Sequence, residues 1–209
     1  MARPVVAPLR REQILNGLFR AIARKGFAAC SVSDIAREAK LPRGILHYYF
    51  RSKEEMLAAL MRSLGEAHLS ALDAYRARFA DPLERLLAVL TFHLAPSDAR
   101  SRDTTRVWIE YWGYGLQERR VREAVRLVQA GLRRRLTEDL AEIRRRRGGT
   151  FEPAAMAVLV LSLVEGPLLQ RLYDEGAFSS RALLVAARRW LGSMLSPRRA
   201  GAVRKGNRR

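Results

Sequence analysis

The sequence has very little cysteine and histidine. Cys30 is the only cysteine among 209 residues, so the chain can form no internal disulfide and no cysteine-based zinc cluster. A lone cysteine fits a reducing compartment, and we therefore expect a cytoplasmic protein in which Cys30 is a small buried residue. The three histidines, His47, His68 and His93, lie far apart and form no H-E-x-x-H motif. We expect no metal site and no cofactor.

Enzyme motifs and long apolar segments are also missing. The sequence contains no glycine-rich phosphate loop after a strand and no nucleophile elbow, so we expect no catalytic activity. Residues 1–9 have no apolar core of signal-peptide length, and the apolar run 154–164 ends at Glu165. Neither segment is expected to span a bilayer, and we predict no membrane partner.

Acidic residues are few compared with basic ones. The chain has 39 Lys and Arg against 21 Asp and Glu, a formal net charge of +18. Such an excess favours a polyanionic partner. Nucleic acid and acidic lipid attract the same charge, so composition leaves open a basic protein that binds DNA without sequence preference, or that lies on a membrane surface, in either case without a regulatory ligand.

The pattern of apolar residues predicts an all-α protein. Apolar residues recur at three- and four-residue spacing, and no β-branched alternation indicates a sheet. A first helix is expected from about Arg10 to Gly26, and Ser31 and Pro42 open two short helices. Ser52 begins a long helix toward Phe79. The next helix is expected over about 82–96, and another follows a polar segment at 97–103. Three further helices are expected over about 119–147, 153–173 and 179–195.

Residues 31–50 carry the motif that indicates DNA binding. They read SVSDIAREAKLPRGILHYYF, a short helix, a turn at 40–42 and a second short helix. Ser31 and Asp34 have the spacing that caps a helix N-terminus. A helix-turn-helix places its second helix in the major groove. Apolar residues face inward (Ile35, Ala36, Ala39, Ile45 and Leu46), and the outer side of the second helix carries Arg43, Gly44, His47 and Tyr48.

The same residues resemble a known family. DIAREA, the turn, a glycine, HYYF and RSKEEML are similar to the DNA-binding signature of the TetR (tetracycline-repressor) family over about residues 10–60. The resemblance implies about nine helices: a three-helix DNA-binding domain over 1–52 and a ligand-binding and dimerisation domain over 53–196. The remaining residues, 197–209, contain six Lys or Arg and no acid, and we expect a disordered basic tail.

The resemblance also implies which side chains contact DNA. Positions that touch bases in the family are occupied here by Ser33, Arg43, Gly44 and His47, and positions that hold phosphates by Ser31, Tyr48, Tyr49 and Lys53. An arginine can donate two hydrogen bonds to a guanine edge, and hydroxyls can bond phosphate oxygens. Tyr49 and Phe50 fit a buried core equally well. Lys40 stands where the family usually has glycine, so we expect a left-handed Lys40, and Pro42 replaces the usual Ser or Thr cap.

The two last predicted helices are the expected dimer interface. The helix over 153–173 is apolar on more than one side, which favours two neighbours, although a monomer with an apolar core helix is the alternative. In the family these helices pair with their two-fold mates, which places two reading helices one DNA turn apart on a pseudo-palindromic operator. The interface residues we expect are Val158, Leu161, Leu168, Leu183, Leu184, Ala187, Trp190 and Leu191.

Residues 106–117, RVWIEYWGYGLQ, are the expected ligand site. An aromatic box with an acid suits a cation, and ordinary core packing is the alternative. This stretch, the following RRVREAV and the VEGPLL around Glu165 resemble the choline-responsive BetI-type repressors, which implies a choline-like effector. We therefore predict a dimeric, ligand-responsive repressor released from its operator by a small molecule. The expected cavity residues are Phe92, His93, Trp108, Tyr111, Trp112 and Glu165.

Overall fold

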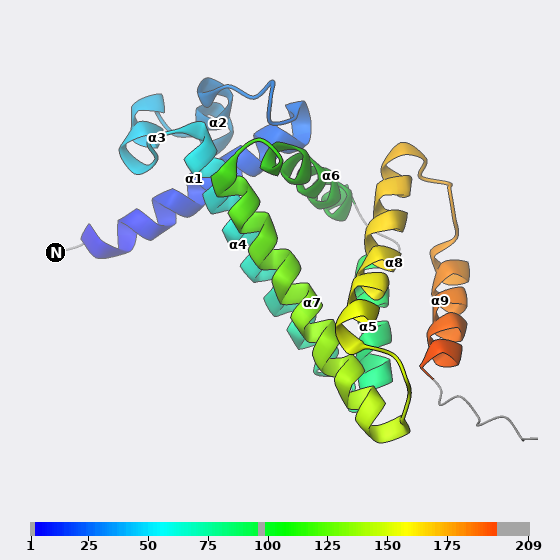
Figure 1. The fold of residues 1–209 in the computed structure, drawn as a ribbon. Helices are drawn as coiled ribbons and strands as arrows, with labels where there is room; N and C mark the ends of the chain where they lie inside the picture. The colour runs from blue at the N-terminus through cyan, green and yellow to red at the C-terminus, as the bar shows by residue number, and fades with distance from the viewer. Residues whose placement is uncertain (1–2, 96–98, 196–209) are drawn as a thin grey trace, which may run out of the picture.

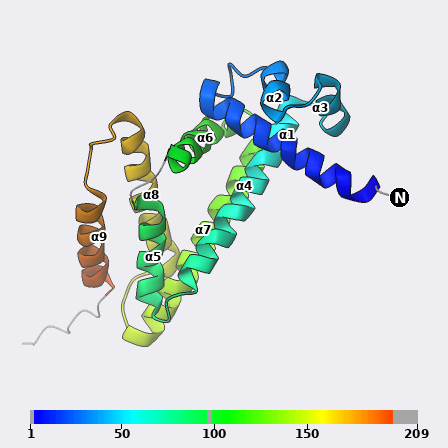
Figure 2. The same cartoon turned by 180° about the vertical axis from the view of Figure 1, so that it is seen from behind.

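The computed structural model describes residues 3–95 and 99–195, and every regular element within these ranges is an α-helix (Figures 1 and 2). The all-α prediction with about nine helices is confirmed, and the predicted tail at 197–209 lies outside the described ranges. The helices are α1 (Arg3–Lys25), α2 (Val32–Ala39), α3 (Arg43–Tyr49), α4 (Lys53–Arg76), α5 (Pro82–Leu94), α6 (Ala99–Gly115), α7 (Arg119–Arg147), α8 (Pro153–Tyr173) and α9 (Ser180–Met194).

Helices α1 to α3 lie together at one end of the molecule (Figure 1). Contact between α1 and α2 is close because Gly17 faces Ala39: a Cβ added to Gly17 would lie 2.7 Å from the Cβ of Ala39. Ile14 and Ile35 are fully buried beside them. As predicted, small inward residues allow the two helices to touch.

Two sequence expectations for this region are wrong. Helix α1 begins at Arg3 rather than near Arg10 and includes Pro8, whose fixed φ suits a helix and which removes only one early hydrogen bond. Ile45 does not anchor α3, because its side chain is 37% exposed whereas Leu46 is fully buried. Successive helical residues point about 100° apart, and a helix as short as α3 turns few of them toward the core.

The rest of the molecule is built around α4 and α7, which lie side by side along most of their length (Figures 1 and 2). A Cβ on Gly65 would lie 2.3 Å from Cγ2 of Val128, so glycine is required for this approach. At the far end, the buried carboxylate of Asp139 accepts hydrogen bonds from Arg76 (2.6 Å) and Arg85 (2.8 Å). These bonds join α4, α5 and α7 to one another.

Helices α6 and α8 differ from the sequence expectations. Helix α6 begins at Ala99, inside the segment 97–103 that we expected to precede it, because that segment contains no glycine or proline after residue 98. Helix α8 is long and apolar enough to cross a membrane, by length and composition alone, since its apolar character continues past Glu165. Part of that surface faces outward, as Val158, Leu159 and Leu169 are exposed.

Candidate DNA-binding face and ligand cavity

The start of α2 is fixed by a capping box, as the sequence predicts. The Ser31 hydroxyl accepts a hydrogen bond from the backbone N–H of Asp34 (3.1 Å), and the Asp34 carboxylate accepts one from the N–H of Ser31 (3.0 Å). The ammonium of Lys25, 2.7 Å away, and the two hydrogen bonds from Ser31 hold the pKa of Asp34 well below its usual range. The N-terminus of α2 is therefore attached firmly to the end of α1.

The turn between α2 and α3 has the predicted backbone. Lys40 adopts a left-handed conformation, with φ 54° and ψ 45°, and its N–H donates to the carbonyl of Arg37 (3.1 Å). The side-chain amide of Gln13 donates to the carbonyl of Ala39 (2.7 Å), so α1 closes the end of α2. Pro42 precedes α3 without a side-chain cap, also as expected.

The outer side of α3 is open to solvent. Arg43, Gly44, His47 and Tyr48 are all exposed, and the ring of Tyr48 is 82% exposed. Within the described part of the chain, no side chain pairs with Arg43 or His47. A Cβ added to Gly44 would meet nothing within 4 Å, so the protein itself does not require a glycine there. Ser33, exposed on α2, completes the expected base-contacting set.

The expected phosphate-binding residues are less uniform. Tyr48 is exposed and its ring lies edge-on to that of Tyr49, with ring centres 5.1 Å apart, whereas Tyr49 is half-buried against the core. Ser31 is exposed, although its hydroxyl already donates to Asp34 (2.7 Å). Lys53 turns inward: its Nζ donates to the carbonyl of Phe27 (2.6 Å) and lies 4.1 Å from the centre of that ring. Motif position alone could not indicate this, because Phe27 is in a distant loop.

Arg11 is a residue of this region that the sequence analysis missed. Its guanidinium donates to the carbonyl of Tyr49 (3.1 Å) and lies 4.4 Å from the centre of the Phe50 ring. Arg11 therefore holds the C-terminal end of α3 against α1. No local motif marks it, since its partners are nearly forty residues away in the sequence.

A cavity of about 370 Å³ lies among α4, α5, α6, α7 and α8. Its walls are largely apolar and aromatic, and Glu165 is the one acidic residue among the described lining residues. Five of the six expected residues line it: Phe92, His93, Trp108, Trp112 and Glu165.

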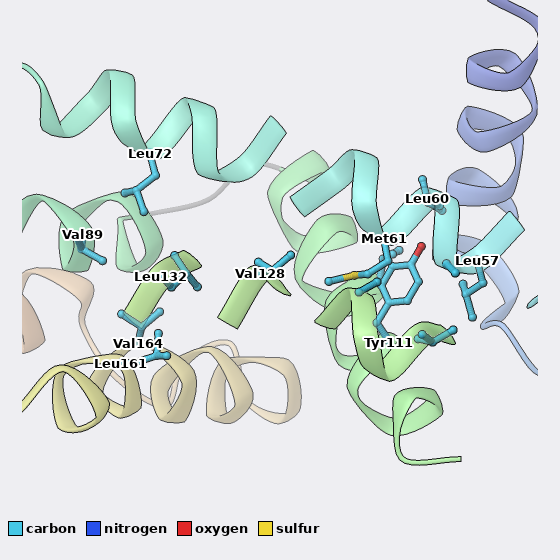
Figure 3. Close-up of a cluster of buried hydrophobic side chains, with 14 of the residues drawn as sticks. Leu57, Leu60, Met61, Leu72, Val89, Tyr111, Val128, Leu132, Leu161 and Val164 are labelled. Carbon is cyan, nitrogen blue, oxygen red and sulfur yellow. The ribbon is translucent and has the colours of Figure 1, made fainter. Parts of the chain in front are cut away.

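The sixth expected cavity residue, Tyr111, was placed wrongly. Figure 3 shows its ring beside Met61, away from Leu161 and Val164 of the cavity wall. Tyr111 is 1% exposed, its hydroxyl has no partner within the described ranges, and burial raises its pKa. This side of α6 packs on α4, so Tyr111 belongs to the core.

Several residues expected at a dimer interface are used inside the chain. Leu161 is 5% exposed and lines the cavity, as does the half-buried Leu168. Ala187 and Leu191 are buried within the chain, because this face of α9 packs inward. In contrast, Val158 and Trp190 are exposed, and Leu183 and Leu184 are half-buried.

The sequence analysis missed four polar residues of the described cavity lining: His68, Gln129, Thr104 and Thr105. The amide of Gln129 donates to the Glu165 carboxylate (2.7 Å), and Nε2 of His68 lies 2.9 Å from Nε2 of His93. Burial lowers the pKa of both histidines, that of His68 to about 4. The spacing of His68 from Leu72, four residues on, gave a signal that His68 faces inward.

Helix α6 connects the cavity with the helix-turn-helix. Tyr114 packs edge-on against Phe27, with ring centres 4.5 Å apart, and its hydroxyl lies 3.5 Å from the Glu54 carboxylate of α4. Glu110 accepts a long hydrogen bond from the N–H of Phe27 (3.4 Å). Because Trp108 and Trp112 of the same helix line the cavity, a displacement of α6 would reach the loop between α1 and α2.

Comparison with known proteins agrees with this architecture. Residues 14–60 match the model of bacterial regulatory proteins of the tetR family, and residues 82–196, more than half of the chain, match that of the BetI-type transcriptional repressor C-terminal domain. The HTH-type transcriptional regulator BetI of Burkholderia thailandensis is 26% identical over 191 residues, which cover 91% of this chain and 95% of the relative.

Solved structures show the same fold. A transcriptional regulator from Rhodococcus sp. Rha1 superposes with a TM-score of 0.74 at 25% identity, covering 88% of this chain and 95% of that one. A regulator from Saccharomonospora viridis, solved in complex with choline, gives a TM-score of 0.79 at 20% identity, covering 88% and 96%.

These matches confirm the predicted regulator and the prediction that the chain is not an enzyme. TetR-family regulators bind DNA operators as dimers and respond to small-molecule effectors. The chain belongs to the TetR family of bacterial transcriptional regulators and carries a C-terminal domain of the BetI-type transcriptional repressors.

Proposed function

We propose that this regulator binds an inverted-repeat operator through residues 1–52, and that residues 53–196 form the dimer and bind a small cation that releases the DNA. The open outer face of α3 is the observation that carries the DNA-binding part. Arg43 is exposed there without a partner among the described side chains, and nothing in the protein fills the space beside Gly44. Such a face lets the backbone of α3 approach base edges closely.

In this proposal Ser33, Arg43, Gly44 and His47 contact bases. Tyr48 is the strongest phosphate contact because its side chain is almost fully exposed. Tyr49 and Ser31 have smaller exposed polar surfaces available, and Lys53 must leave Phe27 before it can reach a phosphate. We expect Lys53→Ala to weaken DNA binding less than Arg43→Ala, since the Lys53 ammonium is already bonded to the Phe27 carbonyl within the protein.

The exposed apolar side chains of α8 and α9 support pairing of these helices between two subunits. Val158, Leu159 and Leu169 are exposed on α8, and Val185 and Trp190 on α9. Exposed apolar side chains on neighbouring elements are typical of an interface between subunits. The substitution Val158→Glu should shift the protein toward monomers in analytical ultracentrifugation, whereas Val158→Leu should not.

The effector proposed here is a choline-like cation. Trp108, Trp112 and Phe92 offer ring faces to the cavity, and Glu165 supplies a negative charge. Within the described ranges, no lysine or arginine lines the cavity. The Saccharomonospora viridis regulator, which has the same fold, was solved with choline.

Release of DNA would follow from movement of α6. A cation held between Trp108 and Glu165 would displace α6 relative to α7 and α8. Through Tyr114, Phe27 and Glu54 this displacement would reach the start of α4 and change the separation of the two α3 helices. Tyr114→Leu should leave choline binding and operator binding intact but reduce the effect of choline on operator affinity. Leu116→Ala, an exposed change nearby, is the control.

The first experiment is selection of bound sequences from a random DNA pool at near-physiological salt. Recovery of one inverted repeat would support the proposal and supply an operator for effector tests. Recovery of unrelated sequences with a steep salt dependence would contradict it, and would favour a basic protein that binds polyanions without sequence preference. Binding to acidic lipid vesicles in place of DNA would indicate the membrane-surface alternative.

A further inference from the structure

Two histidines meet in the wall of the cavity. His68 comes from α4 and His93 from α5, and their Nε2 atoms lie 2.9 Å apart. The His68 ring is surrounded by aromatic neighbours, with centre-to-centre distances of 5.5 Å to Phe92 and 5.8 Å to Trp108. Both histidines line the cavity together with those rings. The pair therefore belongs to the surface that a ligand would touch.

The hydrogen bonds determine where the protons of this pair lie. Nδ1 of His93 is 2.7 Å from the carbonyl oxygen of Val89, and because a carbonyl can only accept, Nδ1 of His93 carries a proton. Burial lowers the pKa of both rings, so each is neutral near pH 7 and holds one proton. Nε2 of His93 is then an acceptor, and Nε2 of His68 is its donor.

This arrangement leaves a lone pair on Nδ1 of His68. No other side chain in the described part of the molecule donates to it. Nδ1 of His68 is not among the fully buried, unpartnered atoms, and His68 lines the cavity, so this lone pair is open to a ligand there. Acceptors in the cavity wall thus include the Glu165 carboxylate and the His68 nitrogen, beside the buried Oε1 of Gln129, and the described lining contains no lysine or arginine.

We propose that Nδ1 of His68 accepts a hydrogen bond from the ligand, so that the cavity selects a small cation carrying a hydroxyl or N–H donor, with His93 as the positioning residue. This inference rests on the proposed cation-binding function. It also predicts weak binding of betaine, in which a carboxylate replaces the hydroxyl-bearing carbon of choline. The Glu165 carboxylate would repel that second carboxylate, and no lysine or arginine in the described lining would offset the repulsion.

Titration calorimetry on the full chain tests the proposal with two cations of equal charge. Choline has a hydroxyl donor, and its O-methyl ether has none. Wild-type protein should bind choline about tenfold more tightly, the usual effect of one hydrogen bond in a buried site. In His68→Phe the two affinities should become equal, while Phe92→Leu, a change in the same wall without a polar atom, should keep the ratio. Betaine should bind wild-type protein far more weakly than choline.

The ¹⁵N spectrum of the histidine rings in the wild-type protein gives a second, independent readout. His93 should be protonated on Nδ1 and His68 on Nε2, and in His93→Phe the ring of His68 should populate both tautomers, with a smaller preference for choline over its ether. A purely structural role of His93 would leave the His68 tautomer unchanged.

Three results would overturn the inference: equal binding of choline and its ether by wild-type protein, an unchanged ratio in His68→Phe, or a His68 ring protonated on Nδ1. Equal binding of both cations would overturn the role of His68 and leave the cation-binding function standing. Absence of binding by either cation would overturn both.

Discussion

The DNA-reading helices and the ligand cavity are built in opposite ways. The reading face of α3 comes from one short segment, and its side chains point to solvent without partners in the described chain. The cavity takes its lining from five helices, and four of its polar side chains form two bonded pairs, His68 with His93 and Gln129 with Glu165. A surface that reads DNA must keep its donors free, whereas a buried polar group must be bonded before the ligand arrives. The two regions should therefore respond differently to substitution.

The largest expected effect is on the stability of the ligand-binding half. Asp139→Ala removes the carboxylate that bonds Arg76 and Arg85 and leaves two guanidinium groups without it. We expect a loss of about 3–5 kcal/mol in the free energy of unfolding, measured by chemical denaturation. Glu138→Ala, which changes an exposed neighbour, should cost less than about 0.5 kcal/mol. A loss in Asp139→Ala as small as that in Glu138→Ala would show that the buried network contributes little to stability.

The next effect separates DNA binding from stability. Arg43→Ala should weaken operator binding by about 1–3 kcal/mol and relax sequence preference at one position, because a bidentate contact to a base is lost. Its unfolding curve should match that of wild-type protein, since Arg43 has no partner in the described chain. Arg119→Ala, on the first turn of α7, is the matched control. Unchanged specificity in Arg43→Ala would refute the base-contacting role.

Gly44→Ala separates two requirements on α3, the stability of the helix and its binding to DNA. An added Cβ meets nothing in the protein, so stability should rise slightly, by less than about 1 kcal/mol, because alanine favours helix. Operator binding should fall, because the methyl group enters the space that the DNA would occupy. Gly113→Ala, in the equally open surroundings of α6, should share the stability gain without the loss of DNA binding. Undiminished DNA binding by Gly44→Ala would argue against close backbone approach.

A pH dependence of stability is expected from the cavity. The pKa of His68 is about 4 in the folded chain, against 6.5 for the free side chain. Between these values the unfolded chain takes up a proton that the folded chain does not, so His68 lowers stability as pH falls below about 6.5. His68→Phe should therefore lose less stability than wild-type protein between pH 6.5 and 4. Parallel curves of unfolding free energy against pH for His68→Phe and wild-type protein would contradict the lowered pKa of His68.

The sequence predicted the parts of the molecule that depend on local rules. The capping box at Ser31 and the left-handed Lys40 follow from neighbouring residues, and both are found. Five cavity residues were also found, because aromatic residues and one acid in an apolar helical context are a strong signal.

The errors arose where packing between distant segments decides the outcome. Lys53 turns to Phe27, and Tyr111 faces Met61 rather than the cavity. Leu161 lines the cavity and is buried within the chain, because α8 is apolar on more than one side and Leu161 is on the inward side. The His68–His93 pair depends on how α4 and α5 pack, which no spacing within either helix specifies.

The central claim is that a cation bound in the cavity releases the operator from the two α3 helices. Its most direct test is to measure whether such a cation releases DNA. Fluorescence anisotropy of a labelled operator, obtained by selection, would follow the complex while choline is added. The account predicts release from wild-type protein, and a requirement for about tenfold or more choline in Glu165→Gln, which loses the charge facing the cation but keeps the shape of the side chain. An operator complex that choline does not release, or that it releases equally well from Glu165→Gln, would contradict the account.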